Sequence, residues 1–324
     1  MSIKDFLKQN NRTLYGVFSG INDYQKAPLE GCINDALGMR KAAINILGFK
    51  ESNCTLLLDS SSTRDNFLSA IEETIYKATD QDSIFITHSG HGSQLPATNK
   101  KEHDGVDEVL VMYGRKGQDL WKECIIRDNE LGEILYKRKN KSRIVFVLDC
   151  CHTGTGTRTL GDPFVTESTK YLVPPEYARK QIILLEKRIS SSIINRNEGS
   201  VSEKNIPNLI SGIFNRLLGR HHGSPSGKRV GGNFVTVNID TDEVLYSGCL
   251  DSETSADTIV NGKPHGAMSG AFLQALYHLR GSSFSYQRLY NNMMRALLNN
   301  SGGVFKQHPQ LEIDSKRLES PFLT

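Results

Sequence analysis

Short apolar runs alternate with amphipathic stretches through the first half of the chain. The runs are rich in β-branched and aromatic residues, which is typical of buried strands. Between them, apolar residues recur every three to four positions, as in helices that cover a sheet. Strands are therefore expected at 13–20, 54–59, 83–88 and 143–149, and helices at 32–47 and after Thr63. This alternation predicts parallel strands that are joined by right-handed crossovers.

The remainder of the chain adds further elements of both kinds. Strands are expected at 108–113, 233–239 and 244–248, helices at 129–137 and 267–279, and a polar lead-in at 1–12. A last strand at 307–313 contains Pro309, which predicts an edge position because proline cannot donate to a ladder. The expected fold class is α/β, with a largely parallel twisted sheet and helices on both of its faces.

The composition of the chain argues against nucleic acid and membrane as binding partners. The net charge of +3 on 324 residues gives no argument for a nucleic-acid binder. No apolar run approaches the roughly 18 residues that span a membrane, and the N-terminus lacks the apolar core of a signal peptide. Six cysteines without a repeated spacing favour reduced thiols. The sequence therefore predicts a cytoplasmic protein that binds neither nucleic acid nor membrane.

Two predicted strands end in chemically reactive residues. The strand at 143–149 is followed by Cys150 and Cys151, and the strand at 83–88 leads into Ser89-Gly-His91-Gly92. Active sites of open α/β sheets lie at the carboxyl ends of the strands. A cysteine at one such end and a histidine at another are typical of a nucleophile and its base. The fold, and not adjacency in the sequence, brings these two residues together.

Peptide-bond cleavage explains why these residue types belong together. The thiolate is the nucleophile of a cysteine, and an imidazole next to it favours that form and later protonates the leaving amine. Cys151 and His91 are candidates for the two roles. The neighbouring glycines allow backbone N–H groups to approach a substrate carbonyl closely. The N–H groups of Gly92 and Cys151 are therefore candidate oxyanion donors.

Two other interpretations of these residues stay open at this point. A cysteine at a strand end is commonly a small apolar residue without chemistry. A zinc site is the second alternative, and its ligands would be drawn from His88, His91, Cys150, Cys151 and His152. Adjacent cysteines argue against zinc, because paired ligands are usually two to four residues apart.

Further motifs accompany the two strand ends in a fixed order. They are Gly31-Cys32-Ile-Asn-Asp35, Asp104-Gly-Val-Asp107-Glu108, Ser247-Gly-Cys249-Leu-Asp-Ser-Glu-Thr254-Ser-Ala-Asp257 followed by Gly266-Ala-Met-Ser269, and Gln307-His-Pro-Gln-Leu311. Together the motifs resemble those of type I metacaspases, in the caspase-like clan of cysteine peptidases. The resemblance covers roughly 13–160 and 232–315. It implies a caspase-like fold, a large-subunit-like region at 13–160, a variable basic insert at 161–231 and a small-subunit-like region at 232–324.

The resemblance also implies roles for individual residues. Cys151 would be the nucleophile and His91 the base, and Asp35, Asp149, Cys32 and Ser89 would line a pocket for Arg or Lys, termed S1. Two carboxylates at the mouth of one crevice would bind a guanidinium through charge-assisted hydrogen bonds. The expected function is therefore a cysteine endopeptidase that cleaves after Arg or Lys.

The resemblance to metacaspases brings calcium into question as a cofactor. Many metacaspases bind it through an acidic loop and an acidic run after the next strand, which leaves Asp107 and Asp128 as candidate ligands here. Arg127 stands where the family pattern often has an acid, and a cation there weakens calcium binding. The sequence predicts that no cofactor is required and that calcium dependence is weak or absent.

The segment 155–231 departs most from the resemblance. It carries many basic residues, among them Arg179, Lys180, Lys187 and Arg188, so an enzyme with a basic specificity would cut its own chain there. A solvated loop, or a docking surface for an activating or inhibitory partner, explains the charges equally well. We expect a regulated and self-processing monomer whose substrates are proteins with exposed Arg or Lys. A catalytically silent caspase-like scaffold controlled by a partner is the alternative function.

Overall fold

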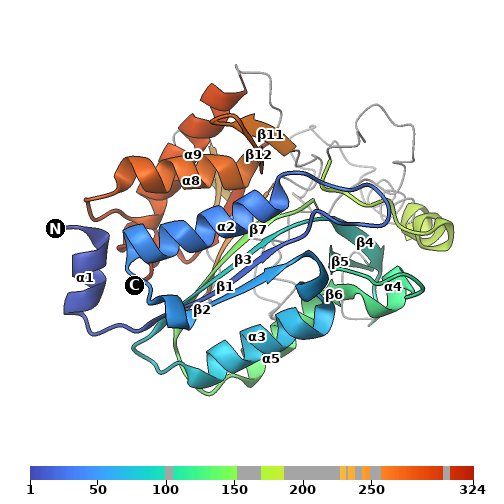
Figure 1. The fold of residues 1–324 in the computed structure, drawn as a ribbon, viewed down its shortest axis with the longest axis horizontal. Coiled ribbons are helices and arrows are strands. Elements are labelled where there is room, and N and C mark those ends of the chain that lie inside the picture. The colour runs from blue at the N-terminus through green and yellow to red at the C-terminus, as the bar shows by residue number, and fades with distance from the viewer. Residues whose placement is uncertain are drawn as a thin grey trace, which may run out of the picture.

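An eight-stranded sheet forms the centre of the molecule (Figure 1). The computed structural model describes residues 1–98, 105–151, 169–185, 227–230, 233–237, 243–248, 257–301 and 307–324. The described strands of this sheet are β1 (Leu14–Gly20), β2 (Cys54–Leu58), β3 (Ser83–Ser89), β7 (Arg143–Asp149), β8 (Gly227–Val230), β9 (Asn233–Val237), β10 (Glu243–Ser247) and β13 (Gln310–Ile313). Their spatial order is β2-β1-β3-β7-β10-β13-β9-β8. Five neighbours, from β2 to β10, pair in parallel, as the alternating pattern predicts.

The prediction of an edge strand near the C-terminus is wrong. β13 lies inside the sheet, antiparallel to β10 and parallel to β9. Pro309 precedes the first residue of β13, so it removes no hydrogen bond from either ladder. A proline next to a strand is therefore compatible with an internal position.

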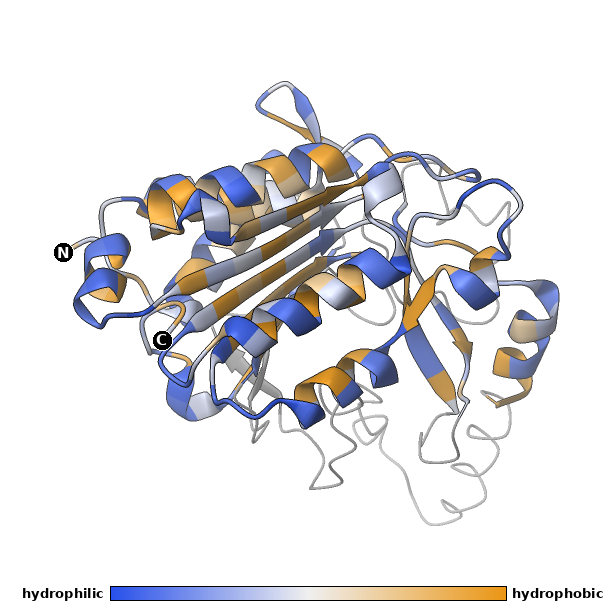
Figure 2. Ribbon diagram, turned by 60° about the horizontal axis from the view of Figure 1, so that its bottom comes forward, coloured by the Kyte–Doolittle hydropathy of each residue, from blue (hydrophilic) through white to orange (hydrophobic). Residues whose placement is uncertain are grey.

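Helices cover both faces of the sheet, which confirms the expected α/β class (Figure 2). One face packs against α2 (Cys32–Ala42), α8 (Ala267–Leu279) and α9 (Tyr286–Asn300), and the other against α3 (Arg64–Lys77) and α5 (Asp128–Lys137). Alternate side chains of β3 pack against the helical layers on the two faces of the sheet. Phe85 belongs to the first layer, and Ile84 and Ile86 belong to the second. The central strands are apolar on both faces for this reason.

Local chemistry sets the limits of the helices. Thr63 caps α3 by accepting the Asn66 N–H, as its position in the sequence suggests. α2 continues into a π-helical turn, Ala43–Leu47, and Gly48 ends it with a left-handed φ of 90°. The expected polar lead-in is instead helix α1 (Ile3–Gln9), which buries Ile3 and Leu7 against the first helical layer.

Two smaller units flank the large sheet. The first is a three-stranded antiparallel sheet of β4 (Gly92–Pro96), β5 (Val106–Val111) and β6 (Ile125–Arg127), with α4 (Leu120–Glu123) preceding β6. The second is a hairpin of β11 (Asp257–Val260) and β12 (Lys263–Gly266). Both lie beside the carboxyl ends of the central strands (Figure 1), where β3 leads directly into β4. None of the described helices has the length and apolar character of a membrane span.

Candidate active site

The pairing of β3 with β7 places the candidate nucleophile and base at one edge of the sheet. The two strands run parallel with Ser89 opposite Asp149. His91 and Cys151 each lie two residues beyond this last pair, and both are fully buried. Gly90 N–H donates to the Asp149 carbonyl at 3.3 Å, which continues the pairing past the strands. The register therefore brings the two strand ends together, as the sequence predicts.

The two candidate oxyanion donors converge on a single atom. Gly92 N–H and Cys151 N–H donate to the carbonyl oxygen of Lys170, over N···O distances of 2.9 and 3.2 Å. Both distances lie within or at the limit of the usual hydrogen-bond range. Backbone N–H groups from two different strand ends thus form a cradle that holds the oxygen of a peptide carbonyl.

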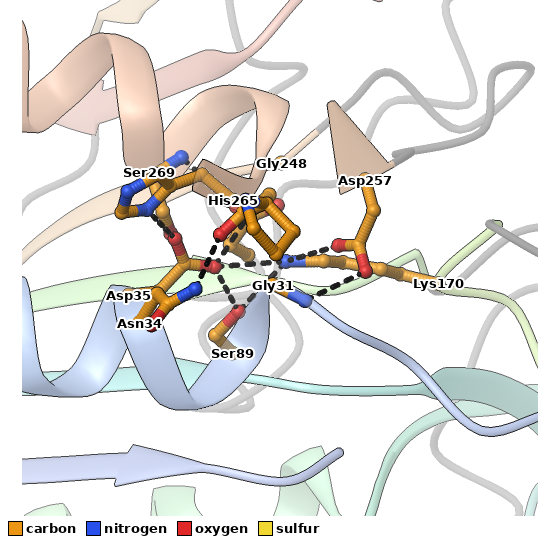
Figure 3. A network of polar contacts seen from close by, with 12 residues as sticks. Gly31, Asn34, Asp35, Ser89, Lys170, Gly248, Asp257, His265 and Ser269 are labelled. Carbon is orange, nitrogen blue, oxygen red and sulfur yellow. Dashed lines mark hydrogen bonds and ion pairs between the residues drawn. The ribbon is translucent and has the colours of Figure 1, made fainter. Parts of the chain in front are cut away.

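Three of the four candidate pocket residues contact a cation, and Figure 3 shows two of them, Asp35 and Ser89, beside Lys170. The ammonium of Lys170 lies 3.3 Å from Asp35 Oδ2, 3.2 Å from Asp149 Oδ2 and 2.7 Å from Ser89 Oγ. Ser89 Oγ in turn donates to Asp35 Oδ2 at 2.6 Å. Burial opposes the charge of Lys170, but Asp149, Cys32, Asp35 and Asp257 outweigh it and hold the pKa of Lys170 well above its ordinary value. The pocket therefore holds a buried charged lysine.

The pocket acids are fixed by backbone donors. Asp35 Oδ2 accepts the Gly266 N–H at 2.9 Å, and Asp149 Oδ2 accepts the Ser269 N–H at 2.9 Å, from the first turn of α8. Both donors belong to the segment that joins the β11–β12 hairpin to α8. Hydrogen bonds of this kind hold the two carboxylates in place.

The hairpin adds two residues that sequence reasoning missed. Asp257 Oδ1 lies 3.8 Å from the Lys170 ammonium, and its Oδ2 accepts the N–H groups of Glu30 and Gly31, both at 2.9 Å. His265 Nδ1 lies 2.8 Å from Asp35 Oδ1 (Figure 3). Asp257 belongs to one of the recognised motifs, and this was the available signal. His265 sits in an ordinary hairpin strand, and nothing in its spacing indicates the site.

His91 is held in an apolar setting. Its ring packs against the ring of Tyr24 with a tilt of 57° and a centroid distance of 4.5 Å. The Tyr24 hydroxyl accepts the backbone N–H of His91 at 2.9 Å, and His91 Nε2 lies 2.6 Å from the Ala27 carbonyl oxygen. Burial lowers the pKa of His91 to about 4, although hydrogen bonds to the backbone of Ala27 and Lys170 oppose the shift. The imidazole is therefore neutral near pH 7 and able to accept a proton.

Two further cysteines near the site, Cys150 and Cys32, are fully buried. Burial raises the pKa of Cys150 well above its ordinary value, and Asp149 adds to this shift. Burial likewise raises the pKa of Cys32. Cys150 packs in the core between the sheet and α3, so it is a small apolar residue of the kind that the structural interpretation described.

Comparison with known proteins identifies this arrangement of strand ends. The family model described as the caspase domain, peptidase family C14, matches residues 17–319. The chain belongs to the caspase-domain family. That family is one of cysteine peptidases, and the curated relatives of this chain are metacaspases. The resemblance drawn from the motifs is thereby confirmed.

Three relatives illustrate the similarity. Metacaspase-1B of Neurospora crassa is 29% identical over 90% of this chain and 64% of its own length. Metacaspase-1 of Cryptococcus neoformans is 29% identical over 87% of this chain, and Metacaspase-1 of Yarrowia lipolytica is 30% identical over 88%; each is covered over 58% of its own length. The chain thus spans less than two thirds of these metacaspases.

A solved structure supports the fold alone. The crystal structure of protein GSU0716 from Geobacter sulfurreducens matches with a TM-score of 0.59 and 20% sequence identity. The match covers 96% of this chain and 98% of the other. The caspase-like fold is therefore observed in a protein of distant sequence.

One of the two candidate calcium ligands of this metacaspase-like chain, Asp107, faces a guanidinium. Asp107 is fully buried and forms an ion pair with Arg127 Nη1. Its Oδ1 accepts from Asn129 Nδ2 at 3.2 Å, and its Oδ2 also accepts from the N–H and the hydroxyl of Thr98. Asp107 is thus contacted by Thr98 and by Arg127 and Asn129, the two residues that flank Asp128. A calcium ion would have to displace the guanidinium, so these residues do not fit the metal.

Several predicted positions lie outside the described residues. They are His152, Asp104, Cys249 and most of the basic segment 155–231. Within the described residues, no group of three or more His, Cys, Asp or Glu side chains is arranged to hold a metal ion. His88 does not join His91: its Nδ1 lies 2.8 Å from Ser19 Oγ and its ring packs on Phe67.

Proposed function

We propose that this chain is a cysteine endopeptidase that cleaves peptide bonds after Arg or Lys through a dyad of Cys151 and His91. The single observation that carries the proposal is the buried ammonium of Lys170 between the carboxylates of Asp35 and Asp149. A pocket of this charge suits a basic side chain and repels an acidic one. Removing one partner of a buried ion pair typically costs about 3–5 kcal/mol, so a neutral or acidic side chain would bind poorly there.

The remaining geometry supplies the other parts of the reaction. Neutral His91 takes the proton of the Cys151 thiol, and the sulfur attacks the carbonyl carbon that follows the residue in the pocket. The developing oxyanion is held by the N–H groups of Gly92 and Cys151, the two donors that hold the Lys170 carbonyl. His91 then protonates the leaving amine, and water releases the acyl group. Loss of one such donor typically lowers kcat about a hundredfold or more.

Calcium has no step in this proposal. The ion pair of Arg127 with Asp107 places a positive charge against the carboxylate that the family pattern would offer to the metal. Because the Arg127 guanidinium already neutralises the Asp107 carboxylate, this carboxylate does not require a divalent cation to balance its charge. We therefore propose that activity is independent of calcium.

Self-processing within 155–231 and control by a protein partner are part of the same proposal. Lys170 belongs to this segment and lies in the pocket. A basic residue of the chain therefore reaches the site that would recognise it.

The proposal is tested with three fluorogenic peptides that carry Arg, Lys or Asp before the scissile bond. Wild type and Cys151→Ala are compared at pH 7.5. Each is assayed with about 5 mM calcium and, separately, with EDTA. We expect turnover of the Arg and Lys peptides only, its loss in Cys151→Ala, and no effect of EDTA. Turnover of the Asp peptide, or full activity of Cys151→Ala, would contradict the assignment.

A further inference from the structure

A groove lies between α2, α8 and the β11–β12 hairpin, three elements that contact one another (Figure 1). Asn34, Leu37 and Lys41 line it from α2, and Gln274 and Tyr277 line it from α8. Within each helix these residues are three or four positions apart, so they share one face. The hairpin supplies the third wall, and the volume of the groove is about 570 Å³. A hollow of this size is typical of sites for small molecules.

Positive charge without a balancing acid distinguishes this groove. Lys41 of α2 and Lys263 of β12 are exposed and line it. No described carboxylate forms an ion pair with either ammonium, and none of the described residues that line the groove is acidic. Gln274 adds an amide whose Oε1 accepts from Asn300 Nδ2 at 2.9 Å, which leaves its own N–H groups as donors. Two cations and an amide donor select a negatively charged group.

An apolar surface accompanies these cations in the same groove. Leu37 and Tyr277 line it and are 43% and 38% exposed, and the buried side chains of Val260 and Leu273 line it as well. Single exposed apolar side chains are ordinary, but several gathered in one hollow with a few polar groups are typical of a binding site. The ligand that fits therefore carries an apolar body in addition to its negative charge.

His265 connects this groove to the S1 pocket. It lines the groove, and its Nδ1 lies 2.8 Å from Asp35 Oδ1. Figure 3 shows the His265 ring and the Lys170 ammonium on opposite sides of the Asp35 carboxylate. β12, which carries Lys263 and His265, also provides the Gly266 N–H that donates to Asp35 Oδ2. A ligand that joins the hairpin to α2 would therefore hold in place the carboxylate that receives a basic side chain.

We propose that the groove binds a small aryl phosphate, with its phosphate at Lys41 and Lys263 and its ring at Leu37 and Tyr277. A phosphate monoester carries about two negative charges and three terminal oxygens, so one group serves both ammonium ions and the Gln274 amide. The bound ligand joins α2 to the hairpin and is a positive effector of basic substrates. The binding site is independent of the proposed function, whereas its effect on substrate rests on that function.

Binding is tested by isothermal titration calorimetry on the full chain with Cys151→Ala, using phenyl phosphate, inorganic phosphate and phenol. We expect phenyl phosphate to bind about tenfold more tightly than inorganic phosphate, because its ring covers apolar surface, and phenol not to bind measurably. Lys41→Ala and Lys263→Ala should each weaken phenyl phosphate about tenfold, and Leu37→Ala should weaken phenyl phosphate but not inorganic phosphate. Lys50→Ala, at an exposed lysine outside the groove, is the matched control and should bind like the parent chain.

The effect on substrate is tested by steady-state kinetics with the Arg peptide. Saturating phenyl phosphate should lower KM about fivefold and leave kcat unchanged, because it stabilises the pocket and not the reacting atoms. His265→Phe keeps a ring in the hairpin but removes the bond to Asp35. Phenyl phosphate should therefore still bind to this variant while its KM no longer responds.

The outcomes separate this inference from the proposed function. If phenyl phosphate does not bind, or binds equally well to the variants that lack Lys41 or Lys263, the site is wrong. If it binds at those lysines but KM is unchanged in the wild-type chain, the effector role is wrong and the site stands. If it binds but the chain hydrolyses no peptide, the proposed function fails and takes the effector role with it, while the phosphate site stands.

Discussion

Gly266 lies directly against the ammonium of Lys170. A Cβ atom built on Gly266 would collide with Lys170 Nζ and with Asp149 Oδ2, and would approach Asp35 Oδ2 to 2.9 Å. The lysine ammonium therefore fills the space that a side chain at Gly266 would occupy. Only glycine can place its backbone N–H on Asp35 at this point without excluding the basic side chain.

We accordingly expect Gly266→Ala to lower kcat/KM for an Arg peptide by about a hundredfold, since that corresponds to about 3 kcal/mol of lost ion pairing. Steady-state kinetics would measure it. Gly38→Ala on α2 is the control, because its added Cβ meets only the end of the Leu273 side chain. Equal losses in both variants would argue against a direct effect on the pocket.

Asp257 is expected to contribute charge to the pocket. Its Oδ1 is 3.8 Å from the lysine ammonium, while its Oδ2 holds two backbone N–H groups. Asp257→Asn keeps the shape and one acceptor but removes the charge, so kcat/KM for Arg and Lys peptides should fall about tenfold, or about 1.4 kcal/mol. Asp65→Asn, at an exposed carboxylate of α3, should have no effect. Unchanged kinetics of Asp257→Asn would remove it from the pocket.

The low pKa of His91 makes the stability of the folded chain sensitive to acid. The folded-state pKa of about 4 lies below the roughly 6.5 of an unfolded histidine, so below pH 6.5 the unfolded chain binds a proton that the folded chain does not. Stability due to this group is present above pH 6.5 and is lost as the pH falls toward 4. Between pH 7 and pH 5 the loss should be about 1–2 kcal/mol.

Urea unfolding of Cys151→Ala, with and without His91→Gln, would measure this contribution. The chain that retains His91 should lose more stability between the two pH values than the chain with glutamine, because glutamine does not titrate. Other titrating groups cancel in the difference. An identical pH dependence would mean that His91 is not buried as a neutral imidazole.

Arg127 should matter for stability rather than for metal binding. Arg127→Ala leaves the buried Asp107 carboxylate without its ion-pair partner, so unfolding should become easier by about 3 kcal/mol. Thermal unfolding in EDTA would measure this, with exposed Arg115→Ala as the control. Calcium-dependent stabilisation of the wild-type chain would contradict the assignment.

Much of the site could be predicted because its residues follow apolar strands. Cys151 and His91 are recognisable at the ends of β7 and β3, and the parallel register then aligns them. Asp35 needed the family motif, since an acidic residue in the first turn of a helix usually serves the helix dipole. Lys170 could not be predicted, because its role depends on how an irregular segment returns to the sheet. A lysine among many others carries no periodic signal.

The errors in the fold have a related origin. The sequence of α1 reads as a lead-in because the helix buries only Ile3 and Leu7, too few to show a helical period. Pro309 predicts an edge position for β13, although the proline lies outside the ladder. In both cases the decisive contacts come from residues distant in sequence, which local patterns do not record.

The pocket is assembled from parts that leave the ribosome at very different times. His91 and Cys151 are synthesised in the first half of the chain, whereas Asp257, Gly266 and Ser269, which complete or hold the acidic pocket, come much later. β13, which lies beside β10, comes later still. Under the proposed mechanism, the nucleophile is therefore synthesised well before the pocket that would select its substrate. A nascent chain would then carry the thiol of Cys151 without a means of recognition, and would acquire its specificity only near the end of synthesis.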